Sequence, residues 1–451
     1  MARRTQGTPR RRPGGTARRD RPVDRFLADK TRTLEGRAHR LAKLDPKTVG
    51  LRAEDRAYAP SARHFAAANQ RLATIAGSIG ERLSDLRTIG RAPHETRLLR
   101  MAMVEREIDR ARRAFGLFFE VFAQRGAAFA PSLMAHDNIA RDCYAAIEEG
   151  GGGLLRKPLL PPLTYLEHGY SPATMRRGVT LKRLLGEPNP FPLIRIPWDR
   201  DRPWQATFLH EVAHNLQADL GLWEENKQAV GRRLAETDMP VSLQAIWQRY
   251  QKEVLADCVA VLLGGPAAAW GMAEFLAHPE SKVANFKSGG VHPPGYLRIF
   301  MLAEMARRMG FAKEGEQLAL VWRTLYGQAA NRRLPPDLLA SAASIIPIMV
   351  DEIAYQPRRA LAERSLADVI SFTADDQRAI RAGASALAED RVPSLPPRFL
   401  VSAARYAISK GAAIPRLGAG LIEHLAHRHL SNPPVRLVSQ HGRGNVQALA
   451  A

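Results

Sequence analysis

The chain has 451 residues, 45% of them hydrophobic, and a formal net charge of +21 from 66 Lys plus Arg and 45 Asp plus Glu. This length and composition predict two or three domains with sizeable hydrophobic cores. With only two cysteines, Cys143 and Cys258, a disulfide framework is excluded, and a reducing compartment is favoured.

No apolar signal stretch follows the basic start, so an ordinary secretory signal is not expected. The apolar run at 338–350 lies between Asp337 and Asp351 and contains Pro347, which makes it too short and too interrupted for a bilayer. We therefore predict a soluble, cytoplasmic protein without a membrane span. Export by a dedicated secretion system stays open as an alternative.

Residues 1–45 are predicted to form a basic, disordered tail. Residues 1–40 hold 13 Lys plus Arg against 4 Asp plus Glu, and the arginine clusters at 10–12 and 18–19 lie among glycines and prolines. One interpretation is that residues 1–40 bind nucleic acid or another acidic partner. The favoured one is a solubilising terminus, because aromatic residues do not interleave with the arginines.

A helical region is predicted for residues 46–150, because apolar residues recur there at helical spacing, with Pro93 and Pro131 as breaks. The glycines at 150–153 and the prolines that follow predict a linker into a second domain, residues 151–333. Strands are expected mainly between 163 and 198, where residues 193–198 resemble a short edge strand able to pair with a peptide.

The next predicted helix, 204–220, carries the sequence His210-Glu211-Val212-Ala213-His214. Residues four apart share a helix face, so both imidazoles can bind one metal ion while Glu211 points at its open position. This spacing is typical of zinc peptidases, in which the glutamate serves as general base for metal-activated water.

A catalytic zinc needs a third protein ligand. Gln217 and Leu220 stand where a metzincin has glycine and a further ligand, which excludes that class. Three nearby acids are interpreted more simply as the solvated end of the helix: Asp219, Glu224 and Glu225.

Glu253 is the preferred third ligand. With Asp257 it lies on one face of an apolar helix extending to about Leu263, where two acids are costly without partners. Zinc would be the partner of Glu253, and a histidine N–H the partner of Asp257. The alternative is a pair of acids at a helix start or in salt bridges with arginines.

A third element begins at His292-Pro293-Pro294 and continues to Arg298. His292 or Tyr296 could donate a hydrogen bond to an oxyanion, and Arg298 could hold the acids or bind a substrate carboxylate. The alternative is that the prolines only cap a new helix that carries Tyr296 and Arg298 on its surface.

These motifs resemble the gluzincin peptidases, whose two-histidine helix precedes a helix carrying a glutamate ligand and an aspartate four residues later. The match comprises His210, Glu211, His214, Glu253 and Asp257. The segment His292–Arg298 is similar to one in CAAX-processing and HtpX-like zinc proteases, whose histidine and arginine lie near the reacting carbonyl and the ligands. Those relatives are embedded in membranes, and this chain departs from them in having no predicted span.

Residues 334–451 are predicted to form a C-terminal helical region. The expected fold is mainly α (α+β), with a zincin-like domain containing a small sheet between helical flanks. The expected activity is zinc-dependent hydrolysis of peptide bonds in a peptide or protein substrate, with Zn²⁺ as cofactor. The alternative is a basic interaction or nucleic-acid-binding protein whose peptidase-like domain is inactive.

Overall fold

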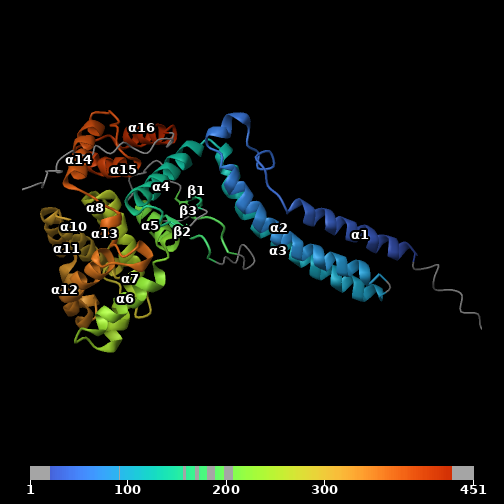
Figure 1. The fold of residues 1–451 in the computed structure, drawn as a ribbon, viewed down its shortest axis with the longest axis horizontal. Coiled ribbons are helices and arrows are strands. Elements are labelled where there is room, and N and C mark those ends of the chain that lie inside the picture. The colour runs from blue at the N-terminus through green and yellow to red at the C-terminus, as the bar shows by residue number, and fades with distance from the viewer. Residues whose placement is uncertain are drawn as a thin grey trace, which may run out of the picture. The chain divides into compact units, whose positions relative to one another are not determined.

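The computed structural model describes residues 21–90, 92–155, 159–167, 172–179, 188–197 and 207–428. They divide into two compact units. Unit 1 contains the described residues up to 127 and those between 178 and 191, and unit 2 contains the others. The prediction of a mainly helical chain with a small sheet is confirmed (Figure 1).

Unit 1 is built from three helices that pack side by side (Figure 1): α1 (Arg21–Arg40), α2 (Ala62–Thr88) and α3 (His94–Ala123). Two short 3-10 helices, Ala53–Ala57 and Gln124–Gly126, accompany them. The predicted helical stretches and the break at Pro93 are confirmed, since α3 begins directly after that proline.

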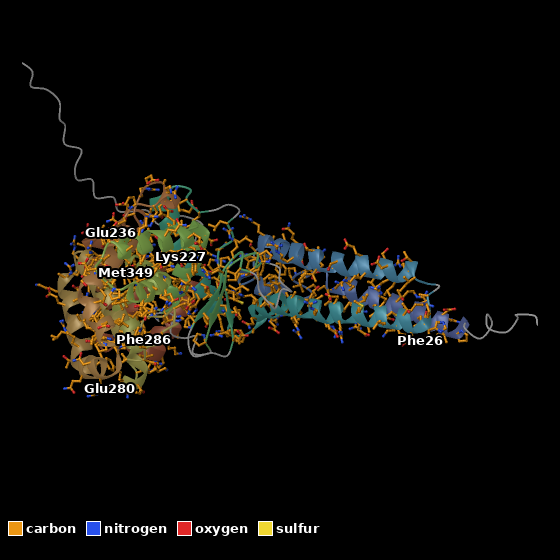
Figure 2. All side chains as sticks on the ribbon, turned by 90° about the horizontal axis from the view of Figure 1, so that it is seen from below. Phe26, Lys227, Glu236, Glu280, Phe286 and Met349 are labelled. Atoms are coloured by element: carbon orange, nitrogen blue, oxygen red, sulfur yellow. The ribbon has the colours of Figure 1, made fainter. Side chains whose placement is uncertain are left out.

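The prediction of a disordered tail over residues 1–45 is wrong for α1, while residues 1–20 lie outside the described part of the chain. Leu27 and Leu34 are buried at a seven-residue spacing, and Arg37 Nη1 lies 2.9 Å from Glu105 Oε1 on α3. Phe26 stays largely exposed (Figure 2). A few apolar residues at helical spacing, together with ion pairs, therefore stabilise this basic helix. The composition of the segment does not show this spacing.

Unit 2 begins with a helix, continues through three strands, and ends in a long series of helices. These helices are α4 (Ala130–Gly151), α5 (Thr207–Leu220), α6 (Trp223–Ala235), α7 (Val241–Gly264), α8 (Pro266–Leu276), α9 (Glu280–Val283), α10 (Gly295–Arg308), α11 (Ala312–Arg333), α12 (Pro336–Val350), α13 (Leu366–Val369), α14 (Ala374–Ala388), α15 (Pro397–Ser409) and α16 (Ile414–Ala426). A short 3-10 helix, Arg359–Leu361, precedes α13.

The sheet of unit 2 has the order β1-β3-β2, formed by β1 (Leu163–Leu166), β2 (Ala173–Met175) and β3 (Leu193–Ile196). The strands lie where they were predicted, but β3 is not an edge strand. It pairs in parallel with β1 and antiparallel with β2, so its hydrogen bonds are used on both sides. Within the described residues the edge beside α5 belongs to β2.

One hydrophobic core joins the middle and C-terminal parts of unit 2, which differs from the predicted boundaries at 150 and 333. Buried residues of α4, α5, α7, α12 and α15 belong to the same cluster. Ser402 Oγ on α15 donates a 2.6 Å hydrogen bond to the carbonyl oxygen of Gly264, at the end of α7. The helices after residue 334 are therefore part of the body that contains α5 and α7.

Among the described residues, one helical stretch, Pro336–Tyr355, is long and apolar enough to cross a membrane. It is longer than predicted, because the helix continues through Pro347 and is extended by a π-helical turn, Asp351–Tyr355. Leu338 and Met349 on this stretch are fully buried in the core, against α7 and α10. The same length and composition are also typical of a core helix in a soluble protein.

The close contact between α4 and α13 predicts a strict requirement for glycine at position 150. A Cβ added to Gly150 would lie 1.9 Å from the carbonyl oxygen of Val369, so backbone must move. We expect Gly150→Ala to lower the free energy of unfolding by about 1–3 kcal/mol, measured by urea denaturation followed by circular dichroism. Gly327→Ala in α11 is the control, because its nearest neighbour is the Tyr296 hydroxyl at 4.0 Å. Equal stability of both variants would contradict the prediction.

Candidate metal centre

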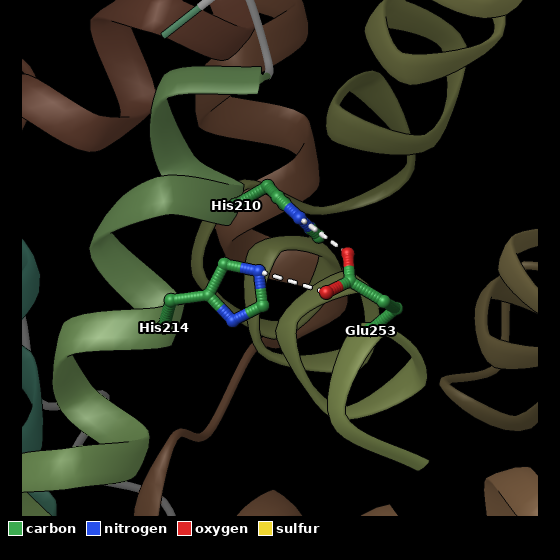
Figure 3. A group of neighbouring side chains, drawn as sticks. All are labelled: His210, His214 and Glu253. Atoms are coloured by element: carbon green, nitrogen blue, oxygen red, sulfur yellow. Dashed lines mark ion pairs between the residues drawn. The ribbon is translucent and has the colours of Figure 1, made fainter. Parts of the chain in front are cut away.

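The two histidines of α5 lie on one buried face, one helical turn apart. Their ring centroids are 4.5 Å apart, and both rings point toward the carboxylate of Glu253 on α7 (Figure 3). The helix ends at Gly221, whose φ of 74° favours glycine and closes the last turn. The predicted helix therefore presents His210 and His214 toward α7, beside which it packs.

Glu253 reaches both histidines through its two carboxylate oxygens. Its Oε2 lies 3.4 Å from His210 Nε2, and its Oε1 lies 3.5 Å from His214 Nε2 (Figure 3). All three side chains are buried, and one potential ligand atom from each lies within 4.8 Å of the others. The predicted third ligand is therefore in contact with the two predicted histidines.

This donor set fits zinc. Two imidazole nitrogens and one carboxylate oxygen are a common protein ligand set of catalytic zinc, which leaves a fourth position open. Ligand atoms about 2.0–2.2 Å from a tetrahedral ion lie roughly 3.3–3.5 Å from one another, close to the distances between Glu253 and the histidine nitrogens. A cation would need little rearrangement of these side chains to replace their direct contacts.

Asp257, one turn after Glu253 on α7, orients the first histidine. His210 Nδ1 lies 2.9 Å from Asp257 Oδ1, and because a carboxylate only accepts, Nδ1 carries the proton. Nε2 is then the nitrogen that faces Glu253 and can bind a metal. His214 lacks this support, since its buried Nδ1 has no hydrogen-bond partner among the described residues.

Arg298 on α10 completes the network around Asp257. Its Nε lies 2.6 Å from Oδ2 and its Nη2 lies 2.7 Å from Oδ1, which is a bidentate pair between buried groups. The same Nη2 is 3.1 Å from His210 Nδ1. The interpretation of Arg298 as a surface residue of a capped helix is therefore wrong, although Pro294 does cap α10.

The pKa values of the two histidines shift in opposite directions. Burial and the charge of Arg298 both oppose protonation of His210, but the hydrogen bond and charge of Asp257 and the hydrogen bond of Glu253 outweigh them and raise its pKa to about 9. Burial lowers the pKa of His214 to about 4, with help from the charge of His210. Glu253 is held ionised despite its burial, because both histidines lower its pKa.

Glu211 faces the cleft that contains the ligands. The cleft has a volume of about 400 Å³ and lies between β2, α5, α7, α8 and the start of α10. Burial raises the pKa of Glu211 to about 7, with a further increase from the charge of Glu253. A cation bound at the three ligands would favour the ionised carboxylate and lower this pKa. The predicted general base therefore shares a cavity with the predicted ligands.

The structure separates His292 from Tyr296. His292 lines the cleft, with Nε2 3.6 Å from Glu253 Oε2 and two thirds of its side chain exposed. Tyr296 lies instead in another cavity of about 390 Å³ between α10, α11 and α12, where its ring packs 4.9 Å from that of Phe300. The prediction that Tyr296 contributes to the site is not supported, because Tyr296 is two residues before Arg298 on α10, about 200° around the helix, and only Arg298 faces the cleft.

The other three acids considered as ligands, Asp219, Glu224 and Glu225, either bind other residues or are exposed. Asp219 is buried, accepts a 2.7 Å hydrogen bond from Tyr144, and lies 2.7 Å from Arg177 Nη2. Glu225 accepts backbone N–H groups from Arg359 and Ala360, and Glu224 is exposed. The interpretation of these acids as a solvated helix end is wrong for Asp219, and Glu224 and Glu225 belong to α6.

Two basic residues of the cleft were not among the predicted site residues: Arg176, just after β2, and Lys252, beside Glu253. Both cations lie over the ring of Trp223, at 5.1 and 5.2 Å from its centroid. The sequence signal for Lys252 was only its place next to Glu253, in a part of α7 that also holds the polar residues Gln248, Arg249 and Gln251. Arg176 had none, because its segment has no periodicity that places it near α5.

The ligand geometry predicts that His210, His214 and Glu253 are each needed for zinc binding. We expect about one zinc per chain in wild type, and an affinity more than about 100-fold lower in His214→Ala or Glu253→Gln, measured by competition with a chromophoric chelator. Glu224→Gln, an exposed acid on α6, is the matched control. Zinc binding that survives loss of Glu253 would exclude it as a ligand.

The buried pair between Asp257 and Arg298 predicts a strong stability coupling. Arg298→Met leaves the Asp257 carboxylate buried and without its bidentate partner, so we expect a loss of about 3–5 kcal/mol in urea unfolding of the metal-free protein. The double variant Asp257→Asn/Arg298→Met removes the stranded charge and should recover part of that loss. Additive effects of the two substitutions would show that the pair is not coupled.

No protein-family model, curated protein or solved structure matches this chain.

Proposed function

We propose that this protein is a zinc-dependent peptidase with a gluzincin-type, zincin-like catalytic region in unit 2. The observation that carries the proposal is the convergence of His210, His214 and Glu253 from two helices, with Glu211 in the same cleft. Burying two imidazoles and a carboxylate costs free energy of desolvation unless a shared charged partner compensates for it. A zinc ion supplies that partner.

The edge strand β2 is the proposed place for an extended peptide. Ala173 and Thr174 line the cleft, and Thr174 Oγ1 accepts a 2.7 Å hydrogen bond from Asn215 on α5. This contact ties the strand to the helix that carries the histidines. A peptide added beside β2 would form backbone hydrogen bonds and present its own peptide bond to the cleft.

When bound, zinc would supply a Lewis acid that activates water and polarises the scissile carbonyl. Glu211 accepts the proton of the attacking water on its carboxylate and returns it to the nitrogen of the departing amine. The exposed imidazole of His292 donates a hydrogen bond to the developing oxyanion. Asp257 fixes the tautomer and ring orientation of His210 by accepting its Nδ1 proton, and Arg298 holds the Asp257 carboxylate in place with two hydrogen bonds.

We place the enzyme in the cytoplasm as a soluble protein. Both cysteines are buried and free, which suits a reducing compartment. Burial raises the thiol pKa of Cys143 and Cys258 well above the usual value, so both are small apolar side chains of the core.

Glu211→Gln tests the proposal directly, because it preserves size and removes the proton acceptor. We expect zinc content to stay within about twofold of wild type and peptide hydrolysis to fall at least about 100-fold. Cleavage is measured by mass spectrometry of a proteome-derived peptide library, with Glu224→Gln as control. Hydrolysis retained by Glu211→Gln would assign the general base elsewhere, and absence of any wild-type cleavage in zinc-loaded protein would overturn the proposed activity.

A further inference from the structure

The two histidines of α5 differ in the surroundings of their second ring nitrogen. Nδ1 of His210 is held by Asp257 at 2.9 Å, whereas Nδ1 of His214 is buried and has no hydrogen-bond partner in the part of the chain that the structure describes. This nitrogen lies on the side of the His214 ring that is turned away from His210 (Figure 3). A metal ion on Nε2 would leave the ring proton on Nδ1, and a buried donor of this kind needs an acceptor.

Gln217 is the next side chain on the same stripe of α5. It is fully buried, and among the described residues neither its Oε1 nor its Nε2 has a hydrogen-bond partner. Residues three apart on a helix have Cβ atoms about 5–6 Å from each other, and helical side chains lean toward the N-terminus of the helix. Gln217 therefore leans toward His214, and a change of rotamer can bring its amide to the free ring nitrogen.

Other buried amides near the ligands are directed elsewhere. Asn215 donates a 2.7 Å hydrogen bond from Nδ2 to Thr174, which holds its side chain toward β2. Gln251 on α7 also has an unpartnered Oε1, but it comes two residues before Glu253, about 200° around the helix, and so points away from the ligands. Of these three amides, Gln217 alone shares a helix face with the histidines.

We propose that Gln217 is the positioning residue of His214: in the metal-bound protein its Oε1 accepts the Nδ1 proton and fixes the ring for coordination. It would do for His214 what Asp257 does for His210. A neutral amide suits this place, because it accepts a proton without adding another buried carboxylate beside Glu253. The inference rests on the metal site of the proposed function, but not on the cleavage of any peptide.

Zinc affinity distinguishes positioning from packing. Gln217→Met keeps the volume and removes the acceptor, so it is expected to lower zinc affinity about 10- to 100-fold in competition with a chromophoric chelator. Gln217→Glu supplies a carboxylate acceptor and should restore the affinity to within about threefold of wild type. Gln251→Met, the same substitution at another buried glutamine, is the matched control and should retain wild-type affinity. A purely structural role of Gln217 would lower the affinity in both of its variants.

Nuclear magnetic resonance provides a second readout, on zinc-loaded protein with ¹⁵N-labelled histidine. Each histidine ligand should show a ring N–H signal, one from His210 and one from His214. We expect Gln217→Met to shift one of these signals upfield and to leave the other in place. Gln217→Glu should move the same signal downfield, because a hydrogen bond to a carboxylate is stronger than one to an amide. If Gln217→Met does not fold, the comparison of wild type with Gln217→Glu decides, and identical signals would overturn the inference.

The results separate failure of this inference from failure of the proposed function. Zinc binding without any peptide cleavage would overturn the peptidase, while zinc affinity and the ring signals would still decide the role of Gln217. Equal zinc affinity of wild type and Gln217→Met would overturn the inference alone. Absence of zinc binding by the wild-type protein would overturn both.

Discussion

The organisation of unit 2 depends on how it accommodates a buried carboxylate, Asp257, in the middle of an apolar helix. Such a group is stable only when charged partners compensate for the water it has lost. Arg298 provides two hydrogen bonds from α10, and His210 provides one from α5. Three helices are therefore held in register by one carboxylate, and the same contact turns His210 Nε2 toward Glu253.

The cluster of His210, His214 and Glu253 could be predicted because its members follow local rules. His210 and His214 are one turn apart, as are Glu253 and Asp257, and acids on an apolar helix need partners. Tyr296 is a residue for which these local rules did not predict the direction of the side chain. A segment can be correctly assigned to the site while the direction of one side chain depends on the angle at which its helix packs.

Other features were beyond the reach of local patterns. Residues 21–40 looked too polar to fold, yet Leu27, Leu34 and ion pairs to α2 and α3 order them as α1. The place of β3 at the centre of the sheet depends on pairing with β2, which has only three residues and no strong strand signal. Arg176 likewise reaches the cleft only because β2 lies against α5. The positions of α1, β3 and Arg176 therefore all depend on contacts with segments that are distant in the sequence.

The shared core of unit 2 has a consequence for the last helices of the chain. Because α15 packs on α7 and forms a hydrogen bond with its final residue, Gly264, we expect the helix that carries Glu253 to unfold together with α15. A ligand that binds only the folded state stabilises everything that unfolds with its site. A metal bound at the proposed site would therefore also raise the resistance of segment 397–409 to proteolysis, although no residue of that segment lines the cleft.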